Sequence, residues 1–256
     1  MRAFLVLALA FTAVLAAPNN PTRIVGGQTT TIDKYPEMVS ILYDSSVRTF
    51  RHTGAGIILN NRAILTGAHI FFNRNTPEAF KFRAGSTFNN IGGQVLDTLR
   101  IIVHPEHQLW PVKNDIAIVH VFGEFNFNNV VRPAAISGPN YPLPDNAEVW
   151  AAGWGYTNPH GPSVTELHDV QMFTVNRDVC RERYTRIGYP ITDDMICSGW
   201  LDVGGHDQCD EDFGGPLYHK GVVVGIFTIY QSCGHEFFPG VNMRVSSFTD
   251  WIISNA

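Results

Sequence analysis

Short runs rich in valine, isoleucine and aromatic residues recur along the chain. Glycine, proline, asparagine or aspartate bounds each of them. The clearest runs cover residues 37–43, 56–59, 95–103, 116–121 and 222–230. Many short strands separated by turn residues are typical of a β-barrel or a β-sandwich. The pattern therefore predicts an all-β protein.

Helical periodicity is confined to two short segments. Residues 176–184 can form a helix capped by Asn176, and residues 245–253 can form one capped by a serine at 246 or 247. The segment 122–144 is rich in asparagine and proline and shows no strand pattern. We expect it to link two halves of the chain.

The N-terminus predicts secretion. Residues 1–16 contain a positive start, an apolar run and small residues before a cleavage point, as in a signal peptide. The apolar run is too short to span a bilayer, and no later stretch is long and apolar enough. With 256 residues, of which 45% are hydrophobic, the remainder can bury a sizeable core. We expect an extracellular protein that is not held in a membrane.

Charge and cysteine content indicate which partners, disulfides and cofactors to expect. The chain carries 18 basic and 23 acidic residues, a net charge of −5, which disfavours binding to nucleic acid or an anionic membrane. Four cysteines predict two disulfides in an oxidising compartment, and the count leaves three pairings open. The sequence contains no CxxC pair of the kind that binds zinc, and we expect neither a metal nor another cofactor.

Three separated segments carry residue types used in nucleophilic catalysis. They read AILTGAH, ending at His69, NDIA, containing Asp115, and CDEDFGGP at 209–216. In this order they resemble the motifs of the trypsin-like serine proteases, whose third motif is CxGDSGGP. The resemblance implies that His69 is the general base and that Asp115 orients it. It also implies two six-stranded antiparallel β-barrels with a short C-terminal helix.

The third segment departs from that family at two positions. Phe213 stands where the family carries its attacking serine, and a phenyl ring has neither a proton to give nor a lone pair for attack. Glu211 replaces the glycine of the oxyanion hole, which the backbone of Glu211 and Phe213 would form. A carboxylate there opposes stabilisation of a developing negative charge. A serine at 213 alone is therefore expected to leave activity near background.

The start of the predicted mature chain resembles the activation junction of trypsin-like zymogens. Residues 17–23 form a short polar propeptide, and Ile24 opens the sequence IVGG. The resemblance implies cleavage after Arg23 by a trypsin-like protease and pairing of the new Ile24 amine with Asp212. Such a buried pair is stable only when both charges are present. The protease-like domain would then cover residues 24–256.

The resemblance also assigns a substrate pocket. Asp207 stands where trypsins bind an arginine or lysine side chain, and Gly240 lies on one wall. Thr228 and Tyr230 occupy the strand that pairs with substrate, with Tyr230 in a glycine position where its ring would obstruct the entrance. The disulfide pairs implied by the family are Cys180–Cys197 and Cys209–Cys233.

Further motifs resemble the secreted alkaline trypsins of lepidopteran digestive fluid. They include NNRAILTxAH, WAAGWG, CSGWLDVGG and GGPLYH. With Phe213 at the nucleophile position, the sequence predicts an inactive homologue that binds a protease, a protease inhibitor or a substrate-like peptide. Two alternatives remain open. One is an active trypsin-like endopeptidase, and the other is an abundant structural or storage protein of a secreted fluid.

Overall fold

The computed structural model describes residues 25–74, 76–158, 161 and 164–256. The predicted signal segment 1–16, the propeptide 17–23, Arg23 and Ile24 therefore lie outside the described residues. Among those described, no helix has the length and apolar character needed to cross a membrane.

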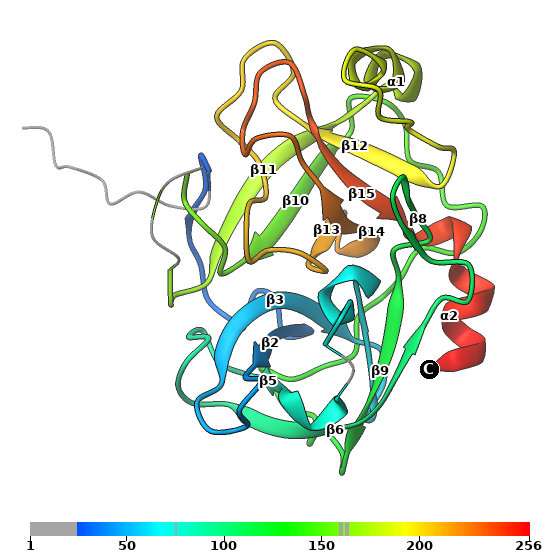
Figure 1. Ribbon diagram of the computed structural model, residues 1–256. Helices are drawn as coiled ribbons and strands as arrows, with labels where there is room; N and C mark the ends of the chain where they lie inside the picture. The colour runs from blue at the N-terminus through cyan, green and yellow to red at the C-terminus, as the bar shows by residue number, and fades with distance from the viewer. Residues whose placement is uncertain (1–24, 75, 159–160, 162–163) are drawn as a thin grey trace, which may run out of the picture.

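The first half of the chain closes into a barrel of six antiparallel strands in the order β2-β3-β4-β9-β6-β5 (Figure 1). Its strands are β2 (Met38–Tyr43), β3 (Arg51–Ile58), β4 (Ala63–Thr66), β5 (Phe80–Ala84), β6 (Gln94–Val103) and β9 (Ala117–Phe122). Alternate residues point inward, as the strand period requires. In β5, for example, Phe80, Phe82 and Ala84 are buried while Lys81 and Arg83 are half-buried. The barrel interior is filled by these apolar side chains.

The second half forms the other barrel. Strands β10 (Glu148–Gly153), β11 (His168–Val175), β12 (Met195–Gly199), β13 (Pro216–His219), β14 (Val222–Ile229) and β15 (Gly240–Arg244) make up its wall. The sheet order is β1-β11-β10-β13-β14-β15-β12, and pairing of β11 with β12 closes it. The short β1 (Gln28–Thr29) adds to its outside edge. The predicted all-β fold with two six-stranded barrels is confirmed.

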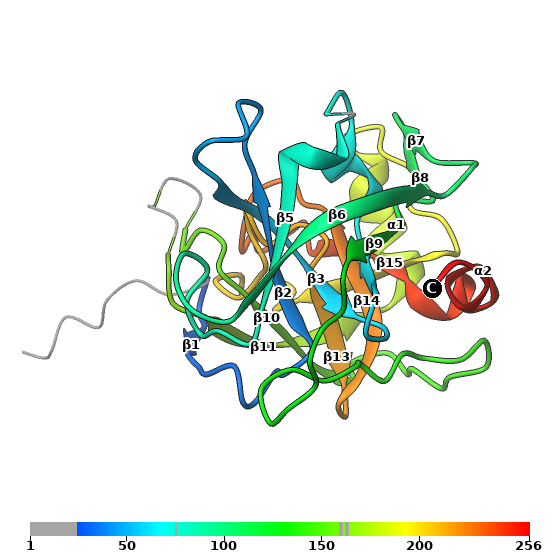
Figure 2. The ribbon, with the colours of Figure 1, turned by 90° about the horizontal axis from the view of Figure 1, so that it is seen from below.

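Residues 122–144 connect the barrels, as their composition predicts, because β9 ends at Phe122 and β10 begins at Glu148. The first barrel lies below the second in Figure 1, and Figure 2 shows the molecule from below. A cluster of buried residues that includes Ile57 of the first barrel and Tyr218 of the second runs across the boundary. Another short hairpin, β7 (Gln108–Leu109) with β8 (Val112–Lys113), precedes Asp115.

Both predicted helices are present. Helix α1 (Arg177–Thr185) begins after Asn176, whose side chain accepts hydrogen bonds from two backbone N–H groups of the first turn. The C-terminal helix α2 (Thr249–Asn255) follows a 3₁₀ turn at Val245–Ser247. The predicted serine cap is wrong, since residue Phe248 precedes this helix and its start has no side-chain cap. The 3₁₀ turn takes up the serines instead.

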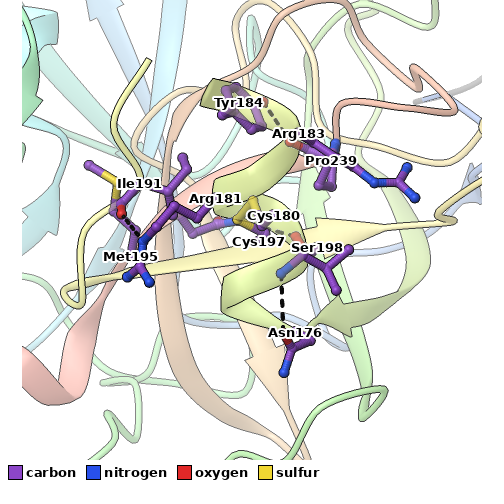
Figure 3. The surroundings of a disulfide bond; sticks show 12 residues. Asn176, Cys180, Arg181, Arg183, Tyr184, Ile191, Met195, Cys197, Ser198 and Pro239 are labelled. Carbon is purple, nitrogen blue, oxygen red and sulfur yellow. Dashed lines mark hydrogen bonds between the residues drawn. A yellow bond between two sulfur atoms is a disulfide. The ribbon is translucent and has the colours of Figure 1, made fainter. Parts of the chain in front are cut away.

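Both disulfide pairs implied by the family are confirmed. The Cys180–Cys197 bond ties α1 to β12, and Figure 3 shows it beside the hydrogen bond from the Tyr184 hydroxyl to the carbonyl of Pro239, 2.7 Å long. The second bond joins Cys209 to Cys233 across 24 residues. It connects the loop before Phe213 to the segment after β14, so it fixes two sides of the site described next.

Candidate active site

His69 and Asp115 lie together on the first barrel. His69 belongs to the 3₁₀ turn Ala68–Phe71 after β4, and Asp115 precedes β9. One carboxylate oxygen of Asp115 accepts from the His69 backbone N–H at 2.7 Å, and the other faces His69 Nδ1 at 2.6 Å. The carboxylate therefore fixes both the position and the orientation of the imidazole, as a general base requires.

Thr228 of the second barrel completes this network. Its hydroxyl donates to the same Asp115 oxygen that faces the imidazole. Asp115 is fully buried, and burial alone would raise its pKa, but the bonds from His69 and Thr228 bring that pKa below its usual value. The carboxylate is thus kept ionised. The sequence predicted Thr228 only as part of the strand that pairs with substrate. Nothing in the residues around Thr228 indicates its contact with Asp115.

Phe213 occupies the position facing the base. Its ring stands edge-on to the His69 ring with 4.8 Å between centroids. His69 Nε2 is buried and has no hydrogen-bond partner within the described part of the chain. The atom that would remove a proton is therefore covered by a phenyl ring.

The loop around Phe213 keeps a tightly constrained backbone. The Phe213 carbonyl accepts a hydrogen bond from the Ala55 N–H at 2.8 Å, and this bond joins the two barrels. Gly214 has φ +75°, and a Cβ there would lie 2.1 Å from the hydroxyl oxygen of Thr66. Only glycine meets both demands. The loop retains its shape although the serine is absent.

Glu211 also lies in a left-handed conformation, with φ +69°. His52 Nε2 is 3.0 Å from the Glu211 carbonyl, while the other ring nitrogen of His52 is 2.8 Å from the Ser40 hydroxyl. Burial lowers the pKa of His52 to about 4, so the ring is neutral and its Nε2–H donates to Glu211. This contact fixes the peptide at the predicted oxyanion position, and the sequence pattern gave no sign of it.

Glu211 forms part of the wall of a separate cavity of about 540 Å³. Arg51 and Arg83 line the same cavity. Neither His69 nor Phe213 is among the residues that line this cavity.

Asp212 is buried in a cradle of backbone. Gly155 N–H donates to one of its oxygens at 2.8 Å, and Cys209 N–H donates to the other at 3.0 Å. A Cβ at Gly153 or Gly155 would lie only 2.0 or 2.4 Å from this carboxylate, so both glycines are required. Burial, together with the nearby Glu211, raises the pKa of Asp212 to about 7. Such a carboxylate is suited to a cationic partner.

Asp207 and Gly240 lie against each other, as predicted for the pocket. A Cβ at Gly240 would be 2.4 Å from one Asp207 oxygen. Asp207 is 2% exposed and accepts from the N–H groups of Gln208 and Gly234 at 2.9 and 3.1 Å. Burial raises its pKa to about 8. Asp207 is therefore a buried carboxyl group that resists ionisation unless a cation lies beside it.

Replacing Asp207 by asparagine is expected to stabilise the protein at alkaline pH. Because the folded-state pKa of Asp207 lies above its value in an unfolded chain, stability falls as pH rises from about 4 to about 8, and the full penalty persists above that. Asp207→Asn should thus add about 2 kcal/mol to the free energy of unfolding at pH 9 and little at pH 4. Thermal unfolding at both values measures this.

The matched control is Asp97→Asn. Asp97 pairs with Lys81 at 2.9 Å, and its side chain is 63% exposed. Exposed pairs contribute little, so the control should leave stability nearly unchanged at both pH values. An equal gain from Asp207→Asn at pH 4 and pH 9 would show that charge burial is not the cause.

The comparison with known protein families decides the classification. The family model described as Trypsin matches residues 24–252. The chain belongs to the trypsin family. Its two barrels, the His69–Asp115 pair and the GGP loop agree with that membership.

Curated relatives of the trypsin family match over their whole length. "Trypsin, alkaline B" of Manduca sexta is 51% identical, and "Trypsin, alkaline A" of the same species is 50% identical, with full coverage of both chains. "Trypsin CFT-1" of Choristoneura fumiferana is 47% identical with the same coverage. The resemblance to lepidopteran alkaline trypsins is confirmed.

These relatives correct one prediction. The departures at Phe213 and Glu211 favoured a protein that is not an enzyme. Relatives about half identical over the full chain are named as trypsins, which points to an enzyme. The prediction gave these departures more weight than the rest of the chain, where His69 and Asp115 lie together and Asp207 lies against Gly240.

No cluster of three or more histidine, cysteine, aspartate or glutamate side chains suited to a metal ion occurs in the described ranges. The described residues bring together an oriented imidazole and a buried carboxylate at the site.

Proposed function

We propose that this chain is a trypsin-like endopeptidase that cleaves peptide bonds after arginine or lysine. The observation that carries the proposal is the network in which Asp115 holds His69 and receives the Thr228 hydroxyl. Asp207 offers a carboxylate to a basic side chain. The names of the full-length relatives support the same reaction class.

Phe213 supplies no hydroxyl, so water is the nucleophile in this proposal. His69 Nε2 removes a proton from a water molecule, and the resulting hydroxide attacks the scissile carbonyl carbon. The C–N bond then breaks, and the imidazolium returns the proton to the leaving amine. Because the Phe213 ring covers Nε2, it must turn aside before water enters. The rate should be about a million-fold below that of an enzyme with its serine in place.

Activation follows from the state of Asp212. Cleavage after Arg23 by a trypsin-like protease would free the Ile24 amine, and an ammonium group near Asp212 would favour the ionised carboxylate. The raised pKa of Asp212, caused by burial, supports this role. Val25, the first described residue, packs against the Cys209–Cys233 disulfide. We propose that the enzyme is secreted and acts on peptide substrates outside the cell.

The test separates slow hydrolysis by this chain from contaminating protease. Protein cleaved with immobilised trypsin is treated with a fluorophosphonate, which inactivates serine nucleophiles, and is then given an arginine peptide substrate. We expect hydrolysis that survives the reagent and disappears in His69→Ala. Hydrolysis that the reagent abolishes, or that persists in His69→Ala, would contradict the proposal.

A further inference from the structure

A side-chain hydrogen bond joins the segments on either side of the Cys209–Cys233 disulfide. Tyr230 follows β14 on one side, and Asp210 follows Cys209 on the other. The Tyr230 hydroxyl donates to the Asp210 carboxylate at 2.6 Å. The Cys209–Cys233 disulfide ties the same two segments together nearby. The phenol therefore bridges two segments whose separation is fixed.

The Tyr230 ring belongs to an aromatic stack that leads to the catalytic base. Its centroid is 5.8 Å from that of Phe213 and 6.2 Å from that of Phe227. Phe213 and Phe227 are themselves stacked at 5.2 Å, with 11° between their planes. Contacts of this kind stabilise the position of a ring beyond the effect of burial. Tyr230 is only partly buried, so the stack holds it in place without enclosing it.

Asp207 lies within electrostatic reach of the same phenol. Burial raises the pKa of Tyr230, and the charges of Asp210 and Asp207 raise it further. Gln208 follows Asp207 in the chain; its side-chain amide is fully buried, and neither of its polar atoms has a hydrogen-bond partner in the described residues. Unpaired buried polar atoms beside a buried carboxyl group indicate a polar space that a ligand can complete.

We propose that Tyr230 is a specificity gate, latched by Asp210, that must swing outward before a basic side chain can reach Asp207. This inference rests on the proposed function, since it assigns the pocket to arginine or lysine. The closed gate lowers the population of the binding-competent state, and the apparent affinity for any cation falls by the same fraction. A compact cationic group, such as an amidinium or the end of an arginine or lysine side chain, is the class of ligand that the opened pocket would take.

The latch and the ring make separate contributions. Loss of the hydroxyl alone removes the hydrogen bond to the charged Asp210, so it should already favour opening. Tyr230→Phe keeps the stacked ring and removes only the latch. Tyr230→Gly removes both and leaves the chain with the residue type that trypsin-like proteases carry at this position.

The experiment measures benzamidine binding by titration calorimetry, because this small aromatic cation needs no turnover. We expect the affinity to rise about threefold in Tyr230→Phe and at least tenfold in Tyr230→Gly. Tyr156→Phe serves as the matched control, since Tyr156 packs on the same disulfide cluster, and it should bind as the unmodified protein does. Thermal unfolding confirms that each variant is folded.

Two results would overturn the gate. One is a folded Tyr230→Gly protein that binds benzamidine no more tightly than the unmodified chain. The other is a gain that survives addition of Asp207→Asn, which would place the ligand elsewhere. An unchanged affinity in Tyr230→Phe would show that the hydrogen bond to Asp210 does not hold the gate closed, and that the ring alone is the barrier.

The proposed function and the gate fail in different ways. Hydrolysis of an arginine peptide by the unmodified protein, with no affinity gain in Tyr230→Gly, would reject the gate alone. A tenfold affinity gain in Tyr230→Gly, with no hydrolysis by either protein, would support the gate and reject the proposed function.

Discussion

Phe213→Ser should raise kcat/KM for an arginine peptide substrate by about 10³- to 10⁶-fold. The serine hydroxyl would replace the phenyl ring beside His69, whose Nε2 has no partner among the residues described. Asp115 already orients the imidazole, and the loop backbone is held by the contact of the Phe213 carbonyl with Ala55. Initial rates before and after the substitution measure the gain.

The control for this substitution is Phe213→Ala. It uncovers Nε2 and admits water but supplies no side-chain nucleophile, so its gain should stay below about tenfold. Labelling by a fluorophosphonate should appear in Phe213→Ser and be absent in Phe213→Ala. Equal gains in the two variants would show that access of water, and not the missing hydroxyl, limits the rate.

This expectation is larger than the one drawn from sequence alone. A carboxylate at the oxyanion position suggested that serine by itself would restore little. The structure raises this expectation because Glu211 lines a cavity whose wall includes neither His69 nor Phe213. The Glu211 peptide is also held by His52. The remaining barrier is then the closed pocket entrance at Tyr230, which affects KM more than kcat.

Asp115→Asn in the Phe213→Ser background should lower kcat by about 10⁴-fold. Asp115 accepts from two groups of His69 and from Thr228, and the asparagine amide would place a donor toward one of them. The imidazole would then take the wrong tautomer for removing the serine proton. Steady-state kinetics at saturating substrate isolate the effect on kcat.

Thr228→Ser is the matched control for the Asp115 substitution. It keeps the hydroxyl that donates to the carboxylate, so its kcat should remain within a few-fold of the parent. A loss below tenfold in Asp115→Asn would mean that the backbone alone orients His69.

The chain pattern predicted the strands well because each alternates or clusters apolar residues between turn residues. The 122–144 link was equally visible from its composition. The cap of the C-terminal helix was predicted wrongly. Serine is a favoured N-cap residue, but both serines lie in a 3₁₀ turn that precedes the helix start at Thr249. Local preference cannot show where one helical form replaces another.

The site was predictable only where a motif fixes both residue type and position. His69 and Asp115 were found in this way, and so was the Asp207–Gly240 contact. The Tyr230–Asp210 hydrogen bond joins residues 20 positions apart. It depends on how β14 and the 209–216 loop are brought together, and no spacing rule within either segment contains that information.

The hydroxyl of Thr228 on the Asp115 carboxylate joins one barrel to the other at the reacting centre. The base and its carboxylate come from the first barrel, whereas the nucleophile position and the pocket come from the second. A shift of one barrel against the other would therefore first change the orientation of the His69 imidazole. Activity therefore depends on how the two barrels are aligned. A substitution in the linker or the shared core can abolish activity while every catalytic side chain is still present.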